Sequence, residues 1–117
     1  ADHLALASVT KVIPIEELRR SATAALFEGR DDVPVSIFVT AYERGQGPSL
    51  HLHPYPEVFV VQAGTAVFTV GDDEVTVAEG HIAVVPAQTP HGFTCAGDDT
   101  LRVVSVHPSG TVQQTDL

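Results

Sequence analysis

From residue 33 onward, the sequence is a succession of short runs rich in β-branched and aromatic residues, each ended by a turn signal. The runs are VPVSIFVTAYE, SLHLHPY, EVFVVQ, TAVFTV, EVTVA, HIAVVP, HGFTCA and LRVVSVH. Glycine-containing turns separate several of them, at residues 63–64, 71–73, 79–80 and 97–99. Strands this short and this closely spaced are typical of antiparallel sandwiches and barrels. We therefore predict a single all-β domain, with its barrel over residues 33–117.

Residues 1–32 form an N-terminal segment with a different pattern. Pro14 suits the start of a helix, and Glu16 and Glu17 would fall in its first turn. We predict at most one short helix, within residues 14–21. The TAALFEG run that follows, residues 23–29, predicts a short strand. We expect the segment to pack on the barrel or on a dimer partner.

Charge and cysteine content exclude several classes of protein. The chain has 117 residues, of which 15 are acidic and 6 basic, giving a net charge of −9. Such a surface repels nucleic acid and anionic membranes. No apolar run approaches the roughly 20 residues that a membrane span needs. The single cysteine, Cys95, cannot form an internal disulfide and suits a reducing compartment. We expect a cytoplasmic protein with neither nucleic-acid nor membrane partners.

The segment HLHPYPE, residues 51–57, places three good metal ligands within seven positions. His51 and His53 are two residues apart, so both imidazoles should point to the same face of a strand. The prolines between His53 and Glu57 break strand pairing, and the bend lets the carboxylate fold back toward the rings. Two imidazoles and a carboxylate are the ligands of a mononuclear divalent-metal site. His91, which begins the HGFTC run, is the best candidate for a fourth ligand.

The wider spacing resembles the two signatures of the cupin superfamily. Gly45, five residues, His51, one residue, His53, three residues, Glu57, six residues and Gly64 reproduce the first signature. Gly80, Pro86 and His91 resemble the second. Two positions depart from it, with Gln88 where the family usually has glycine and Cys95 where it often has asparagine.

The resemblance implies the cupin fold, a jelly-roll β-barrel with one metal ion inside. Its ligands would be His51, His53, Glu57 and His91. Manganese, iron, nickel, copper and zinc all suit three nitrogens and one oxygen, and the sequence does not choose among them. Small single-domain cupins resemble one another in forming dimers, so we also expect a homodimer.

Four further residues are candidates for a substrate pocket beside the metal, namely Phe59, Phe93, Cys95 and Tyr55. Phe93 and Cys95 lie two and four residues after His91, and Phe59 lies two residues after Glu57. In a strand, each of these side chains would point to the same face as that ligand. Core packing alone would also turn Phe59 inward. We expect the thiol of Cys95 to be buried and inert.

Two more aromatic residues lie near the expected site. Tyr55, between two prolines at the barrel rim, could donate a hydrogen bond to a substrate or simply pack there. His107 ends the last long strand, and we expect it to be exposed there. A role beside the metal ligands is the alternative for His107.

Four protein ligands leave open positions on an octahedral metal, which is typical of catalytic sites. We therefore predict a metal-dependent enzyme, dioxygenase-like, acting on a small organic compound that chelates the metal through oxygen. Glu57 could serve as general base as well as ligand. Isomerase, cyclase or decarboxylase chemistry is compatible with the same fold. A non-catalytic module that binds a metal or a small ligand is the alternative to an enzyme.

Overall fold

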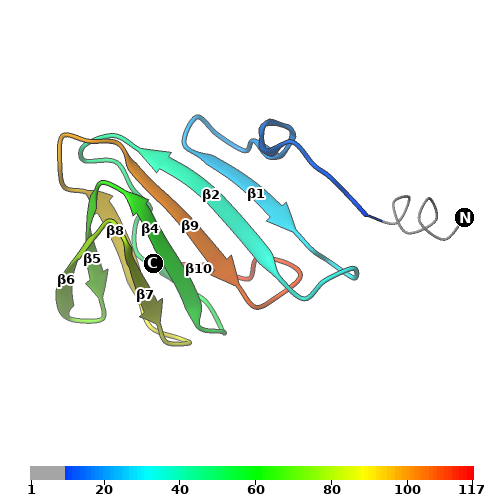
Figure 1. The fold of residues 1–117 in the computed structure, drawn as a ribbon. Helices are drawn as coiled ribbons and strands as arrows, with labels where there is room; N and C mark the ends of the chain where they lie inside the picture. The colour runs from blue at the N-terminus through cyan, green and yellow to red at the C-terminus, as the bar shows by residue number, and fades with distance from the viewer. Residues whose placement is uncertain (1–9) are drawn as a thin grey trace, which may run out of the picture.

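The computed structural model describes residues 10–117, which form two facing antiparallel sheets of five strands each (Figure 1). The first sheet has the order β1 (Ala24–Glu28), β2 (Ser36–Tyr42), β9 (Leu101–His107), β4 (Glu57–Ala63), β7 (His81–Val85). The second has the order β10 (Thr115–Asp116), β3 (His51–Leu52), β8 (His91–Cys95), β5 (Thr65–Val70), β6 (Asp73–Ala78). The predicted all-β jelly roll is confirmed, and its strand order brings segments far apart in sequence side by side.

The helix expected near the N-terminus is a single 3-10 turn, η1 (Ile15–Leu18). It ends at once because Arg19 already has an extended backbone. The predicted strand that follows is β1, which pairs with β2 from Ala24 opposite Thr40 to Glu28 opposite Ser36. The N-terminal strand is therefore the edge strand of the first sheet of its own chain. Within residues 10–117, no helix is long and apolar enough to cross a membrane.

The core lies between the two sheets and is built from alternate residues of their strands. Along β4, Glu57, Phe59 and Val61 are buried while the residues between them are more exposed. The ring of Phe59 meets that of Phe68 edge to face at 5.0 Å, and Phe68 stacks on Phe93 at 4.7 Å. Burying side chains of this size contributes about 1.5–3 kcal/mol each, so this aromatic cluster holds the sheets together.

Backbone geometry explains one glycine of the first signature. Gly64 joins β4 to β5 with a φ of +79°, and a Cβ there would lie 2.8 Å from the carbonyl oxygen of Thr100. A larger residue would meet both the left-handed backbone and this close contact. The turn therefore depends on glycine.

Gln88, the departure from the second signature, also has a left-handed backbone, with a φ of +59°. Its side chain is exposed, and its N–H donates to the carbonyl of His53 at 2.7 Å. The loop therefore keeps the conformation that glycine favours and accepts the strain of a side chain, which costs about 1 kcal/mol or more. The hydrogen bond from the N–H of Gln88 helps to position the backbone of His53, a candidate metal ligand.

We expect Gln88→Gly to raise the free energy of unfolding by about 1 kcal/mol, because glycine adopts positive φ without strain. Urea denaturation measures the change. Gln62, exposed within β4, is the matched control. Gln62→Gly should destabilise by about 0.5–1 kcal/mol, because glycine loses more backbone freedom on folding than glutamine does. Loss of stability in Gln88→Gly would contradict this account.

Candidate metal centre

The candidate site lies between the two sheets, where three strands present four buried side chains. His51 on β3 is the cross-strand partner of His91 on β8. Pairing of β3 with β10 ends at Leu52, and the PYP segment leads to Glu57 at the start of β4. The ligand atoms of His51, His53, Glu57 and His91 all lie within 4.8 Å of one another. The four predicted ligands therefore meet in one small space.

Each of the three histidines donates a hydrogen bond from its Nδ1 to a backbone carbonyl oxygen. The distances are 2.7 Å from His51 to Ser49, 2.7 Å from His53 to Gln113, and 2.8 Å from His91 to Thr89. A carbonyl oxygen only accepts hydrogen bonds, so Nδ1 is the protonated nitrogen of each neutral ring. The three Nε2 atoms are then free lone pairs, which is the state that binds a metal.

The nitrogens face one oxygen of Glu57. Oε1 lies 2.9 Å from Nε2 of His53 and 3.1 Å from Nε2 of His91. Nε2 of His53 is buried without a hydrogen-bond partner. Lone pairs of two nitrogens and a carboxylate repel one another at these distances, and a cation or an added proton relieves the repulsion. Three imidazoles and one carboxylate therefore fit a divalent transition metal ion.

A fourth histidine, His107 at the end of β9, holds the other oxygen of Glu57. Its Nε2 lies 3.0 Å from Oε2 of Glu57. The expectation that His107 is exposed is wrong, since it is only 1% exposed. It pairs with Ser36 of β2, and the chain turns back beyond it, where Ser36 donates to the carbonyl of Ser109. Only the folded chain shows that the strand end is covered.

Tyr55 decides which nitrogen of His107 carries the proton. Its hydroxyl accepts a hydrogen bond from the N–H of Gln113 at 3.2 Å and lies 2.7 Å from Nδ1 of His107. If the hydroxyl donates to Nδ1, Nε2 of His107 carries its proton toward Glu57, which can only accept. This tautomer is the reverse of that in the three ligand histidines. His107 is therefore a hydrogen-bond donor to the site rather than a fifth ligand.

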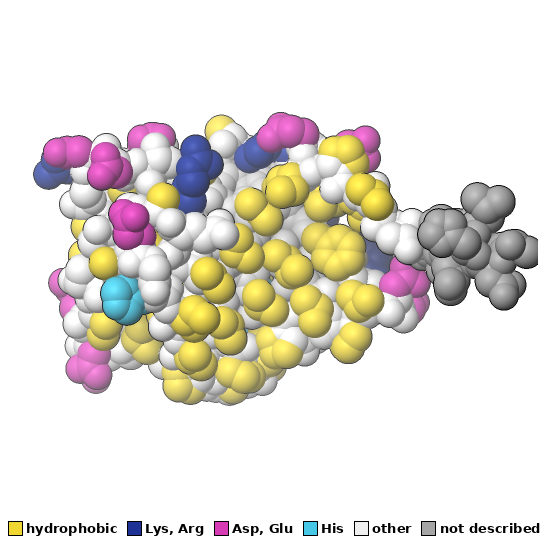
Figure 2. All heavy atoms as spheres, in the orientation of Figure 1, with side chains coloured by type: hydrophobic (Ala, Val, Ile, Leu, Met, Phe, Trp, Pro, Cys, Tyr) yellow, Lys and Arg dark blue, Asp and Glu magenta, His cyan; other side chains and the backbone are white. Residues whose placement is uncertain are grey.

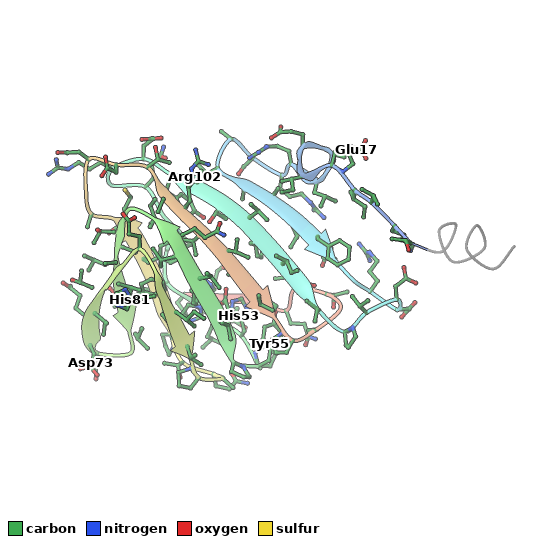
Figure 3. All side chains as sticks on the ribbon, viewed as in Figure 1. Glu17, His53, Tyr55, Asp73, His81 and Arg102 are labelled. Atoms are coloured by element: carbon green, nitrogen blue, oxygen red, sulfur yellow. The ribbon has the colours of Figure 1, made fainter. Side chains whose placement is uncertain are left out.

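The C-terminal segment completes this network through its backbone. Gln113 supplies the carbonyl that orients His53 and the N–H that orients Tyr55. The ring of Tyr55 stacks on that of His53, with centroids 5.2 Å apart. Figure 3 shows both side chains close together, near the start of β4 and the end of β9. Backbone groups are present at every residue, so no sequence motif could have identified this contribution.

The surroundings fix the charges of the site. Burial raises the pKa of Glu57, but the nitrogens of His107, His53 and His91 that surround the carboxylate outweigh it and hold that pKa far below its usual range. Burial lowers the pKa of His51. Burial also opposes charge on His53, yet once protonated this ring can donate to Glu57 as well as to Gln113, and these interactions outweigh burial and raise its pKa. Glu57 is therefore ionised near neutral pH, and His53 is the ring that most readily takes a proton in place of a metal.

A cavity of about 220 Å³ opens beside the ligands. His51, His53 and Glu57 line one part of it. The remaining walls come from Phe38, Thr40, Tyr42, Pro48, Phe59, Phe93, Val103, Ser105, His107, Gln114 and Ala24. Apart from His107, whose Nε2 binds Glu57, these wall residues are aromatic, aliphatic, hydroxyl or amide groups. The cavity suits a compact, largely apolar molecule that reaches the metal with its polar end.

The structure places the four candidate pocket residues differently. Phe59 and Phe93 line the cavity. Cys95 lies in the core cluster, with its thiol directed to the carbonyl of Asp99 at 3.4 Å, so it does not line the cavity. Tyr55 is not part of the wall either, because its hydroxyl is directed to His107. The alternation of side chains along each strand identified the inward-facing residues. It does not determine the distance of each residue from the ligands.

Comparison with known proteins supports these observations. Residues 38–107 match the family described as the cupin domain. An uncharacterized protein of Streptomyces coelicolor, SCO3923, is 36% identical over 72 residues, which cover 62% of this chain and 68% of that protein.

Solved structures share the fold at low sequence identity. An uncharacterized conserved protein with a double-stranded β-helix domain from Klebsiella pneumoniae has a TM-score of 0.73 and 20% identity. The match covers 91% of this chain and 96% of that one. Oxalate decarboxylase of Bacillus subtilis, studied for its Mn(II) centres, has a TM-score of 0.77 and 16% identity. That match covers 96% of this chain but 36% of the enzyme.

We expect Tyr55→Phe to weaken Mn²⁺ binding about tenfold, because His107 would lose the partner that fixes its tautomer. Competition with a fluorescent chelator measures the affinity. Tyr42→Phe removes the other tyrosine hydroxyl, which lines the cavity and has Thr40 rather than His107 as its hydrogen-bond partner, and should leave the affinity unchanged. Equal affinities in wild type and Tyr55→Phe would show that the hydroxyl does not orient the site.

We expect metal affinity to fall as the pH is lowered from about 8 to about 6, by up to tenfold per unit for each proton that competes. The raised pKa of His53 sets the sign, because its protonated form blocks Nε2. Glu57 stays ionised over this range and does not compete. Isothermal titration with Zn²⁺ in buffers of matched ionic strength measures the trend. A constant affinity would contradict it.

Proposed function

The chain belongs to the cupin family, and from this premise we propose that it is a metal-dependent enzyme, dioxygenase-like, acting on a small organic molecule. The observation that carries the proposal is the set of three tautomer-fixed histidines and one ionised glutamate, of which His51, His53 and Glu57 line a cavity. A purely structural metal would be enclosed by its ligands. Here the ligands border space that a substrate can enter.

A bound divalent transition metal would supply Lewis-acid chemistry or dioxygen activation at the cavity wall. Nε2 of His51, His53 and His91, together with Oε1 of Glu57, would hold it. His107 donates a hydrogen bond to Oε2 of Glu57 and so leaves Oε1 as the oxygen that faces the nitrogens. The three Nδ1 hydrogen bonds keep the rings from rotating. The protein therefore contributes a preorganised site.

The electrostatics favour one role for Glu57 over the other that the sequence suggested. A general base works best when its pKa lies near the operating pH. The surrounding histidine nitrogens hold the pKa of Glu57 far below that, so it is a weak base. We therefore assign Glu57 first as a ligand. Proton transfer by Glu57 would require that it leave its histidine partners.

The cavity wall indicates the class of substrate. No lysine or arginine lines it among the described residues, so a second carboxylate far from the metal would find no counter-charge. Phe38, Phe59 and Phe93 offer flat apolar contacts, and Thr40 and Ser105 offer hydroxyls. These features support a small aromatic or enolisable compound that chelates through oxygen. They disfavour oxalate, the substrate named for the decarboxylase of similar fold.

The test combines metal content with turnover. Protein purified without a histidine tag is analysed by inductively coupled plasma mass spectrometry, then loaded with Mn²⁺, Fe²⁺, Ni²⁺, Cu²⁺ or Zn²⁺. Each form is assayed for oxygen uptake with catechols, flavonols and β-diketones, and for carbon dioxide release from oxalate. Uptake with one chelating class supports the proposal. Binding without turnover of any compound would instead indicate a non-catalytic binding module.

We expect His51→Ala and His91→Ala to lose at least 90% of the bound metal, since each removes one of four ligands. His81→Ala is the matched control, because His81 is exposed at the start of β7, where its Nδ1 contacts the carbonyl of Ala78. It should retain full metal content. Retention of metal by both ligand variants would place the metal elsewhere and overturn the proposal.

A further inference from the structure

The second half of β9 reverses the usual arrangement of polar and apolar side chains. In an antiparallel sheet that covers one core, polar residues usually face water and apolar residues face inward. Here the buried residues are Ser105 and His107. Val104 and Val106 face outward, where Figure 2 shows hydrophobic side chains gathered over the sheet. His107 has a partner inside the molecule, since its Nε2 binds Glu57, but Ser105 has no such partner.

The hydroxyl of Ser105 differs from the other hydroxyls of the cavity wall in having a free proton. Thr40 donates its proton to the carbonyl of Val103 at 2.9 Å. Thr40 can then only accept from its other partner, the hydroxyl of Tyr42, so the proton of Tyr42 is also used. Ser105 is 6% exposed, and within residues 10–117 no group forms a hydrogen bond with its hydroxyl. A buried hydroxyl without a partner is unfavourable, so a bound molecule that supplies one gains affinity.

Ser105 lies between two aromatic residues of the cavity wall. Its cross-strand partners are Phe38 on β2 and Phe59 on β4. Both rings also contact histidines of the metal centre, with the centroid of Phe38 5.4 Å from that of His107 and the centroid of Phe59 5.9 Å from that of His91. Ser105 and His107 are two residues apart on one strand, so their side chains are about 7 Å apart. A flat molecule on the two phenylalanine rings would therefore extend from the metal centre to the hydroxyl of Ser105.

The charges around the cavity determine what kind of group Ser105 can bind. Among the described residues, no lysine or arginine lines the cavity, whereas the carboxylate of Glu57 does. A negatively charged group beside Ser105 would therefore be buried without a counter-charge. A group that only donates hydrogen bonds would leave the proton of Ser105 unpaired. The partner that fits Ser105 is an uncharged acceptor oxygen.

We propose that the hydroxyl of Ser105 donates a hydrogen bond to an uncharged carbonyl or ether oxygen of the substrate and so determines which chelating compounds the cavity accepts. This inference rests on the proposed function, because it takes the chelating end of the substrate to be held at the metal centre. The separation along β9 and the two flanking rings favour a planar compound, with two adjacent oxygens at one edge and the acceptor oxygen at the opposite edge. A catechol that carries an acyl group in the 4-position has this form.

Binding to the Zn²⁺-loaded protein tests recognition separately from turnover, because zinc has no redox chemistry. The two probes are 3,4-dihydroxyacetophenone and 4-ethylcatechol, which differ in that a methylene group replaces the carbonyl. Isothermal titration calorimetry measures the dissociation constant of each. The acetyl group also makes the catechol more acidic, so the protein variants are compared by the ratio of the two dissociation constants. This acidity is the same for every variant and cancels in the comparison.

We expect Ser105→Ala to bind 3,4-dihydroxyacetophenone about 3- to 10-fold more weakly than wild type, which is the usual effect of one uncharged hydrogen bond. It should bind 4-ethylcatechol at least as tightly as wild type, because this compound leaves the hydroxyl of Ser105 unpaired. Ser105→Thr keeps a hydroxyl and should keep the ratio near that of wild type. Ser36→Ala is the matched control, since Ser36 is a buried serine outside the cavity wall that donates to the carbonyl of Ser109. Its ratio should be unchanged.

The same ratio in wild type and Ser105→Ala would overturn the inference, as would failure of both catechols to bind the Zn²⁺-loaded protein. Zinc content is measured for each variant first, so that loss of metal is not mistaken for loss of a hydrogen bond. A ratio that depends on Ser105, without oxygen uptake by any metal-loaded form, would support this inference and contradict the proposed enzyme. Oxygen uptake with catechols and a ratio independent of Ser105 would do the reverse.

Discussion

The buried carboxylate of Glu57 is the constraint on which the rest of the site depends. An ionised carboxylate away from water is unfavourable by several kcal/mol unless it has partners. Nitrogens of His53, His91 and His107, from different parts of the chain, lie within about 3 Å of its two oxygens. Supplying these partners requires both sheets, because the ligands lie on or beside β3, β4 and β8 and His107 lies on β9. The barrel therefore has to be closed before the carboxylate is satisfied.

The two oxygens of Glu57 are kept chemically distinct by the tautomers around them. Oε1 faces nitrogens whose protons are held elsewhere by backbone carbonyls, and Oε2 faces a nitrogen that carries its proton. A metal ion satisfies the first arrangement and His107 satisfies the second. This division depends on hydrogen bonds to Ser49, Thr89, Gln113 and the hydroxyl of Tyr55. Loops and the C-terminal segment thus decide what the strand residues can bind.

The two faces of the first sheet meet different requirements. Its inner face carries the aromatic core and one wall of the cavity. On its other face Val58 and Val60 of β4 lie beside Val106 and Val104 of β9, so these two strands are nearly continuous hydrophobic runs. Strands that are buried on both sides have this character.

The sequence by itself determined the all-β fold, the four ligand residues and the inward direction of Phe59 and Phe93, because strand alternation and turn glycines are local properties. It also located the strained position Gln88 through a departure from a spaced motif. The buried state of His107, its link to Tyr55, and the carbonyl of Gln113 on His53 were decided only by tertiary structure. Each joins residues more than 50 positions apart, and one uses a backbone group that every residue has. The apolar surface that β4 and β9 share likewise needed the strand order, since these segments lie side by side only after they pair in register.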